Sequence, residues 1–284
     1  MNADLEKHIA TSCDIPPLPL VAAKVVDLLA NEDVTAEQLT EVISRDAALA
    51  SRVLKIANSS FYRRSEEIRK LKSALVVVGM RTIKSIVFSA ALKQIFNSSS
   101  LFDRLLWEHS VATAIAGTML ARETGYLQPD EVMLAGLLHD LGKNILNNSM
   151  PNRYQHVVER VYAEGLSYCQ VETEVVGFAH HHVGPLLVKH WNLPMNLGKA
   201  IYFHHEIDRL GEMVDEQKLL VALVHLADLF CKKLGLGYRA PDETLDITLS
   251  PAIAILGLEH DGENGANYEE RIMQLFQEEK GRFE

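Results

Sequence analysis

The sequence predicts an all-α fold built from two helical blocks, and three observations support this prediction. Apolar residues recur at spacings of three and four along nearly the whole chain, which is the period of an amphipathic helix. The alternation typical of strands is absent from the N-terminal part. The polar run NSSS at residues 97–100 is the clearest linker. We therefore expect an N-terminal helical bundle, residues 1–96, packed on a C-terminal helical bundle, residues 97–284.

The first block is expected to contain five helices after a stiff proline-rich segment at residues 16–19. Thr35 suits the N-cap of the second helix, whose apolar positions include Ile43. Gly79 is the expected break between the last two helices. The other four expected helices span residues 20–30, 47–58, 71–78 and 82–96.

The second block is expected to open with a long helix over residues 101–124. The next helix is predicted to carry His139 and Asp140 inside an apolar run. An irregular stretch rich in Gly, Pro and Asp follows at residues 235–249, before two short C-terminal helices. The remaining expected helices of this block span residues 152–164, 171–178, 184–191, 194–203 and 216–234.

The overall charge makes a nucleic-acid partner unfavourable. The net charge is -10 and the pI is about 5.7, so the chain as a whole repels a phosphate backbone. Basic residues do concentrate in the first block, where they could form an anion or partner-docking face, although a solvated helical surface is the more common explanation. These residues are Arg45, Arg52, Lys55, Arg63, Arg64, Arg69, Lys70, Lys72, Arg81 and Lys84.

Cysteine usage and hydropathy predict a soluble cytoplasmic protein with no membrane contact. Cys13, Cys169 and Cys231 are far apart and form no CxxC pair, which is typical of a reducing compartment and argues against a disulfide framework or a thiolate metal site. The N-terminus has no basic region followed by a long apolar core, and no apolar run approaches the ~18 residues of a membrane span.

The chemistry is expected around Asp140, in the segment LLHDLGK at residues 137–143. The apolar run would carry this carboxylate into the interior, where it costs several kcal/mol unless it is paired or bound to a metal. His109 lies on the apolar stripe of the long helix, and further histidines and a late aspartate lie on later helices. These later candidates are His180, His181, His182, His204, His205 and Asp228.

Imidazole nitrogen and carboxylate oxygen together suit zinc, iron, manganese or nickel, and one carboxylate can bridge two ions. Two ions roughly 3.5 to 4 Å apart could polarise a phosphoryl oxygen and activate a water. Simpler interpretations exist for each residue: His109 as a hydrogen-bonded core residue, His139 and Asp140 as an ion pair, and Lys143 as a solvated charge. Neighbours on a helix diverge by ~100°, so at most two of the three histidines at 180–182 can face one point. We assign His156, His190, His225 and His260 to no site.

The order His109, His139–Asp140, Asp228 resembles the HD-domain superfamily, whose metal-dependent phosphohydrolases use H, HD and D in this order. The first block is also similar to the HDOD domain of bacterial signalling proteins, and this resemblance extends from about Ile15 to Leu234. It implies an HD-type helical bundle and a signalling role. The segments that carry it are IPPLP (15–19), residues 43–46, VLKIANSSFY (53–62), SALVVVGM (73–80), HWNLP (190–194) and FHHE (203–206).

A further resemblance is to the HD-GYP phosphodiesterases, in which a histidine four residues before a glycine and a paired HH complete a binuclear site. Here His180 precedes Gly184, but no GYP motif follows the HH pair, so the main reason to name cyclic di-GMP as substrate is missing. The resemblance implies that Asp140 bridges the ions and that Lys143 contacts a substrate phosphate. The implied metal ligands are His109, His139, Asp140, His180, His204, His205 and Asp228.

Two classes of function follow from these patterns. In the first, the protein is a signalling module that binds an unidentified protein partner and keeps one or two divalent ions (Fe, Mn, Zn or Ni) at the HD site. In the second, it is a metal-dependent phosphohydrolase or phosphodiesterase acting on a phosphoester or nucleotide, with Asp140 and Lys143 as its catalytic residues. A third interpretation is a hydrogen-bonded histidine core without metal.

Overall fold

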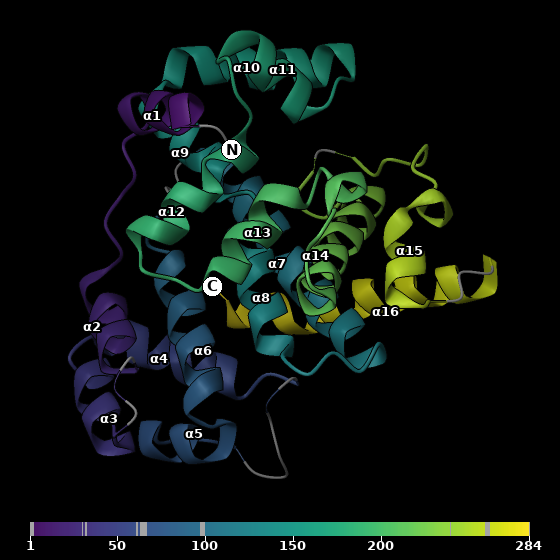
Figure 1. Cartoon of the computed structure of the whole chain (residues 1–284). Coiled ribbons are helices and arrows are strands. Elements are labelled where there is room, and N and C mark those ends of the chain that lie inside the picture. Colours follow the sequence, from purple (N-terminus) through teal and green to yellow (C-terminus); the bar gives the residue numbers. More distant parts are fainter. Residues whose placement is uncertain are drawn as a thin grey trace.

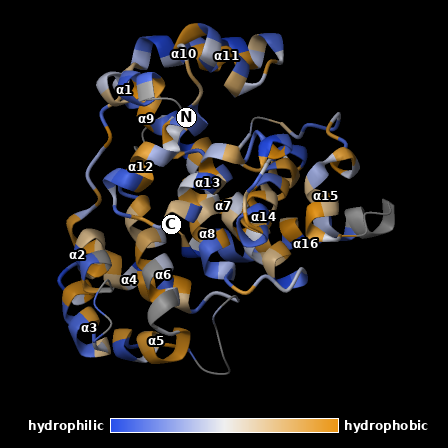
Figure 2. Ribbon diagram, viewed as in Figure 1, coloured by the Kyte–Doolittle hydropathy of each residue, from blue (hydrophilic) through white to orange (hydrophobic). Residues whose placement is uncertain are grey.

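The all-α prediction is confirmed. The computed structural model describes residues 3–29, 31, 33–60, 62, 67–96, 100–238, 240–258 and 262–283, and every regular element in these ranges is a helix. Figure 1 shows the purple and blue helices of the first block beside the teal, green and yellow helices of the second. Figure 2 shows hydrophobic and hydrophilic residues on the same helices, as the three-to-four spacing predicts.

The first block contains helices close to the predicted ones. Thr35 and Gln38 form a capping box at the start of the second expected helix, and Gly79, with φ of 87°, separates the last two. The last helix ends at Leu92 rather than near Phe96. The helices are α1 (Ala3–Ser12), α2 (Leu20–Leu29), α3 (Ala36–Ser44), α4 (Ala47–Ala57), α5 (Leu71–Val78) and α6 (Met80–Leu92).

Helix α1 was not predicted, and it contacts the second block. The ring of His8 packs edge-on against Phe178, with 5.6 Å between ring centroids. Farther along, the indole N–H of Trp191 donates to the carbonyl of Pro16 at 2.9 Å. The N-terminal segment therefore packs against helices of the second block (Figure 1).

The second block is organised around the long helix α7, which packs against α8 and α14. Its helices are α7 (Leu101–Glu123), α8 (Pro129–Leu138), α9 (Leu141–Ser149), α10 (Pro151–Glu164), α11 (Tyr168–Val175), α12 (Gly184–His190), α13 (Met195–Phe203), α14 (Asp215–Lys233), α15 (Pro251–Leu256) and α16 (Gly262–Glu279). Four short 3₁₀ turns complete it: η1 (His180–His182), η2 (Ile207–Arg209), η3 (Ile247–Leu249) and η4 (Lys280–Arg282).

Two expectations about the second block were wrong. His139 and Asp140 do not lie within one helix but in the turn between α8 and α9, because the backbone of Asp140 (φ -104°, ψ 3°) leaves the helical region. Helix α16 has 18 residues and is not short. Of the predicted linker, residues 97–99 lie outside the described residues, whereas the hydroxyl of Ser100 caps α7 by accepting from the N–H of Asp103.

Hydrogen bonds join the first block to the second. The hydroxyls of Tyr62 and Thr82 donate to the two carboxylate oxygens of Asp130 in α8, at 2.7 and 2.6 Å. The N–H of Ser60 donates to the carboxylate of Glu279 in α16 at 2.9 Å. The division of the chain between residues 96 and 97 stays a prediction.

The basic residues of the first block are partly compensated by acidic neighbours. Exposed ion pairs of this kind are screened by water and contribute little to stability, so these pairs are consistent with a solvated surface. Arg63, Arg64 and His260 lie outside the described residues. The ion pairs are Arg45 with Glu41, Arg69 with Glu67 and Lys72 with Glu37.

No helix in the described part of the chain is long and apolar enough to cross a membrane.

Candidate metal centre

The seven expected ligand residues lie together in the second block, although they come from five separate places in the chain. Six of them are at most 1% exposed, and only the side chain of His205, at 20%, reaches solvent. Their ligand atoms form two adjoining groups, each within 4.8 Å. The first group is His109, His139 and Asp228, and the second is Asp140, His180, His204 and His205.

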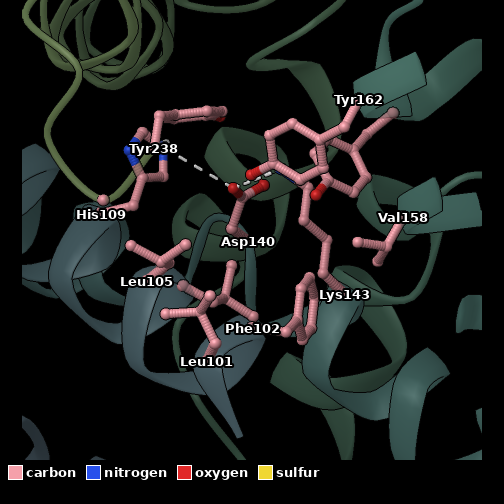
Figure 3. A pocket seen from close by; sticks show the side chains of 12 residues that line it. Leu101, Phe102, Leu105, His109, Asp140, Lys143, Val158, Tyr162 and Tyr238 are labelled. Atoms are coloured by element: carbon pink, nitrogen blue, oxygen red, sulfur yellow. Dashed lines mark hydrogen bonds and ion pairs between the residues drawn. The ribbon is translucent and has the colours of Figure 1, made fainter. Parts of the chain in front are cut away.

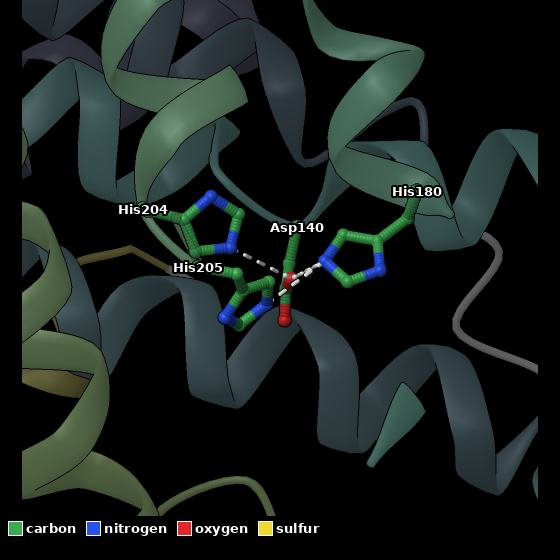
Figure 4. A group of neighbouring side chains, drawn as sticks. All are labelled: Asp140, His180, His204 and His205. Carbon is green, nitrogen blue, oxygen red and sulfur yellow. Dashed lines mark hydrogen bonds and ion pairs between the residues drawn. The ribbon is translucent and has the colours of Figure 1, made fainter. Parts of the chain in front are cut away.

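The carboxylate of Asp140 lies between the two groups. Its Oδ1 is 3.1 Å from Nε2 of His180 and 3.8 Å from Nε2 of His204. Its Oδ2 is 3.5 Å from Nε2 of His139 and 3.7 Å from Nε2 of His109. One carboxylate oxygen thus faces each group, as a bridging ligand requires. Figure 4 shows the imidazoles of His180, His204 and His205 around this carboxylate.

The backbone orients several of these imidazoles through their other nitrogen. Nδ1 of His139 lies 2.6 Å from the carbonyl of Gly136, and Nδ1 of His204 lies 2.7 Å from the carbonyl of Ile201. These contacts require Nδ1–H as the donor, because a carbonyl can only accept. The Nε2 lone pair of each ring therefore points into the cluster, which is the arrangement found behind histidine ligands in metal sites.

Nε2 of His204 is buried and has no hydrogen-bond partner, and the buried Oδ1 of Asp140 has only Nε2 of His180 within reach, at 3.1 Å. Nε2 of His109 and Nε2 of His139 lie only 3.3 Å apart, a short separation for two acceptor nitrogens. Buried acceptors without a donor cost about 1–3 kcal/mol each. A shared cation satisfies all of these atoms at once, so the residues fit one or two divalent transition-metal ions.

The protonation states of four of these residues also fit metal ligation, whereas the charge of Glu172 raises the pKa of His180. Burial lowers the pKa of His139 to about 4 and holds the pKa of His204 well below its ordinary value, so both rings are neutral near pH 7. Burial alone would raise the pKa of Asp140, but the nearby ammonium of Lys143 outweighs burial and holds that pKa well below its ordinary value. Asp228 has a lowered pKa for the same reason, with Lys232 as its main cationic neighbour. Metal ligands must be deprotonated.

Each of the two aspartates forms an ion pair with a lysine. Nζ of Lys143 lies 2.6 Å from Oδ2 of Asp140, and Nζ of Lys232 lies 2.6 Å from Oδ2 of Asp228. Lys143 is only 3% exposed, so it is not the solvated charge that its sequence position allows. Its ammonium also lies 4.4 Å from the centroid of the Tyr168 ring.

Sequence reasoning missed three residues that support the cluster. Glu172 is fully buried, and its Oε2 accepts hydrogen bonds from the N–H and the Nδ1 of His180, at 2.8 and 2.6 Å. Lys232 is four residues from Asp228, a spacing at which helical side chains meet, so this pair could have been found. His225, which we assigned to no site, has its Nδ1 2.6 Å from the carbonyl of His204.

Among the three consecutive histidines, His180 is the one that faces Asp140. His181 points elsewhere: its Nδ1 lies 3.6 Å from Sγ of Cys169, and its Nε2 lies 3.8 Å from the carboxylate of Glu206. His182 turns back onto the backbone of Ala179. This divergence follows from their adjacent positions in a 3₁₀ turn.

Two clefts open onto the cluster. The first is lined by His109, Asp140 and Lys143 together with apolar and tyrosine side chains (Figure 3). The second is larger and reaches His205 and Lys232. The clefts share Lys143 and the tyrosines at 162, 168 and 238, so a ligand can approach the site from outside.

A helical bundle that gathers H, HD and D residues in this order is the arrangement of the HD superfamily. Within it, the model of the HDOD domain matches residues 15–207, and the chain belongs to the HDOD family. The match ends before Leu234, where we expected the resemblance to end, so Asp228 and Lys232 lie beyond it.

Comparison with known proteins agrees with this family. An HDOD domain protein from Geobacter sulfurreducens is 26% identical with a TM-score of 0.79, and the match covers 96% of this chain and 94% of that one. A Shewanella amazonensis protein, provisionally named a phosphohydrolase, shares the fold at 24% identity with a TM-score of 0.73, covering 99% and 98% of the two chains. An uncharacterised Treponema pallidum protein is 26% identical over 76% of this chain, which spans only 42% of that relative.

Proposed function

We propose that this chain hydrolyses phosphoesters with the help of divalent metal ions held by the seven clustered ligands. One observation carries the proposal: the carboxylate of Asp140 presents one oxygen to each of two His/Asp groups, beside a cleft. Bound divalent ions at such a site would polarise a phosphoryl oxygen and lower the pKa of a nucleophilic water.

Charge favours an anionic ligand at this site. Three buried carboxylates, those of Asp140, Glu172 and Asp228, are opposed by two ammonium groups, those of Lys143 and Lys232. The net charge of these five groups is therefore about -1, and two divalent ions would change it to about +3. A phosphoryl group is the anion that Lewis-acid ions and a lysine ammonium bind together.

The residues of the chain have separate tasks in this proposal. Lys143 lines both clefts and is the group placed to bind a phosphate oxygen, while it holds the Asp140 carboxylate in its orientation. Glu172 fixes the ring of His180, and the carbonyl of Gly136 fixes the ring of His139. Preorganised ligands of this kind lower the reorganisation that a reaction would otherwise require.

A second candidate function is a signalling module that binds a phosphorylated ligand or a protein partner without turnover. The HDOD resemblance supports it, because that domain is found in bacterial signalling proteins. The contact of Tyr62 and Thr82 with Asp130 supports it too, since it links the first block to the helix that leads to the HD pair. Metal occupancy is compatible with both candidates.

The test measures metal content and turnover on the full chain. We expect one or two equivalents of transition metal by mass spectrometry, and release of nitrophenol from bis(p-nitrophenyl) phosphate with added Mn²⁺ or Fe²⁺. Asp140→Asn should abolish turnover while circular dichroism shows the same helix content. Asp130→Asn is the matched control, because this aspartate lies at the other end of α8 and should leave turnover intact.

The outcomes separate the two candidates. Turnover that disappears in Asp140→Asn and persists in Asp130→Asn supports the enzyme. Tight metal binding without turnover of any phosphoester supports the signalling module instead. If the protein contains no transition metal as purified and binds none when Mn²⁺ or Fe²⁺ is added, both the enzyme and the metal-containing signalling module are refuted. Only a hydrogen-bonded histidine core then remains.

A further inference from the structure

We infer that the organic group of the ligand at this site is apolar, an aryl or alkyl group, rather than a nucleobase. This inference rests on the proposed function, because it takes the phosphoryl end of the ligand to lie at Asp140 and Lys143. It derives from the lining of the first cleft, which begins at these two residues.

One wall of the first cleft is apolar. Leucines at the start of α7 form it, and Leu101 at this wall is 53% exposed. Figure 3 shows Leu101 and Leu105 on the side of the cleft next to His109, and Val158 on the opposite side beside Tyr162. An exposed leucine beside a concave apolar surface is typical of a ligand-binding cleft. The apolar lining consists of Leu101, Phe102, Leu105, Leu106 and Val158.

Three tyrosines form the other wall. Tyr168 lies beneath the ammonium of Lys143, and the ring of Tyr238 meets His109 edge-on with 4.9 Å between centroids. Tyr162 and Tyr168 share a hydrogen bond between their side chains, so these two hydroxyls already contact each other. Tyrosine rings in the lining of a cleft offer apolar surface to an aromatic or alkyl group.

The same lining offers little to a nucleobase. Its polar side chains other than tyrosine are His109, Asp140 and Lys143, and these belong to the metal centre. Among the residues that line this cleft there is no Asn, Gln, Ser or Thr. A base buried here would lose water from several donors and acceptors without gaining partners, and such groups are costly to desolvate.

The second cleft is more polar than the first. It contains Ser167, Lys232 and Asp242 in addition to the shared lysine and tyrosines. Polar groups of a bound ligand can therefore extend through the second cleft and stay in contact with water. The two clefts together favour a phosphoester with one apolar substituent, held in the first cleft.

The test compares the affinities of four probes for the full chain in the presence of Mn²⁺, measured by calorimetry. The probes are inorganic phosphate, methyl phosphate, 1-naphthyl phosphate and AMP. We expect 1-naphthyl phosphate to bind at least about tenfold more tightly than either methyl phosphate or AMP, because only its ring system is buried without a polar penalty.

Equal affinity for methyl and 1-naphthyl phosphate, or tighter binding of AMP, overturns the inference but leaves the proposed function standing, since the phosphoryl end still binds. If none of the four probes binds to protein that contains metal, the proposed function fails and this inference fails with it.

Variants locate the effect in the first cleft. Val158→Trp fills the cleft and should reduce the ratio of 1-naphthyl phosphate affinity to inorganic phosphate affinity about tenfold. Leu105→Gln keeps the size and removes the apolar surface, so it should lower the same ratio even if the tryptophan is not tolerated. Val214→Trp is the control, because Val214 is 61% exposed and lines neither cleft. An unchanged ratio in both cleft variants refutes the assignment.

Discussion

Glu172 offers the sharpest test of how the proposed centre is built, because the proposed ligand that it contacts is His180. Its Oε2 accepts both the N–H and the Nδ1–H of His180, so the carboxylate determines which ring nitrogen faces Asp140. Burial would lower the pKa of His180, but the charge of Glu172 outweighs burial and raises that pKa. Glu172→Gln keeps the shape of this side chain and one acceptor oxygen, removes the charge, and replaces the other oxygen with an NH2 group next to the Tyr154 hydroxyl.

The expected effect of Glu172→Gln is a loss of metal affinity of about tenfold to a hundredfold, the range seen when a carboxylate behind a histidine ligand is removed. This corresponds to about 1.4–2.7 kcal/mol. The hydrogen bonds suggest a similar size: a bond to a charged group contributes about 1 kcal/mol more than a neutral one, and two such bonds reach His180.

The assay is a competition for Mn²⁺ or Zn²⁺ between the protein and a chromogenic chelator. Tyr154→Phe is the matched control, because the Tyr154 hydroxyl donates to the other oxygen of the same carboxylate at 2.7 Å and does not touch His180. We expect this control to change metal affinity less than about threefold. The reasoning is refuted if Glu172→Gln binds metal as tightly as the parent protein, or if the control loses as much affinity.

Three other predictions concern the same centre. Gly142→Ala should lower metal content, since a β-carbon there would overlap the carbonyl oxygen of His180; full occupancy by mass spectrometry would contradict this. In metal-free protein, burial lowers the pKa of His139 to about 4, so the unfolded state takes up protons first as the pH falls. The free energy of unfolding in urea should therefore decrease by up to ~3 kcal/mol between pH 6.5 and pH 4 from this residue, and a flat profile would refute the reasoning. Lys232→Met should destabilise metal-free protein, because it leaves the buried carboxylate of Asp228 without its ammonium, and added Mn²⁺ should restore most of the thermal midpoint.

Local sequence patterns were sufficient to predict a helix boundary where neighbouring residues determine it. Thr35, the predicted cap of α3, accepts from the N–H of Gln38 three residues away, and Ser100, which was assigned only to the linker, accepts from the N–H of Asp103 at the same spacing. Gly79 ends one helix because its φ of 87° favours glycine. Each of these features is encoded within a few neighbouring positions.

Contacts distant in sequence account for what the sequence did not predict. Glu172 and Glu174 look alike in the segment VETEV, yet Glu172 is buried against Tyr154 and His180 while Glu174 pairs with Arg160 near the surface. Nothing in the local pattern distinguishes the two glutamates. The turn at Asp140 has a similar origin, because the helix that follows it lies against the chain around His180.

The two lysine–aspartate pairs explain how these helices can pack around so many buried polar groups before any ion is bound. A buried carboxylate without a counter-charge costs several kcal/mol, and Lys143 and Lys232 supply that charge to Asp140 and Asp228. A metal ion that binds the carboxylate of Asp140 or Asp228 neutralises part of its negative charge. The lysine ammonium beside that carboxylate can then attract another anion. Both lysines line the larger cleft. Metal binding and the binding of a phosphorylated ligand should therefore reinforce each other at this site, since each relieves the charge that the other introduces.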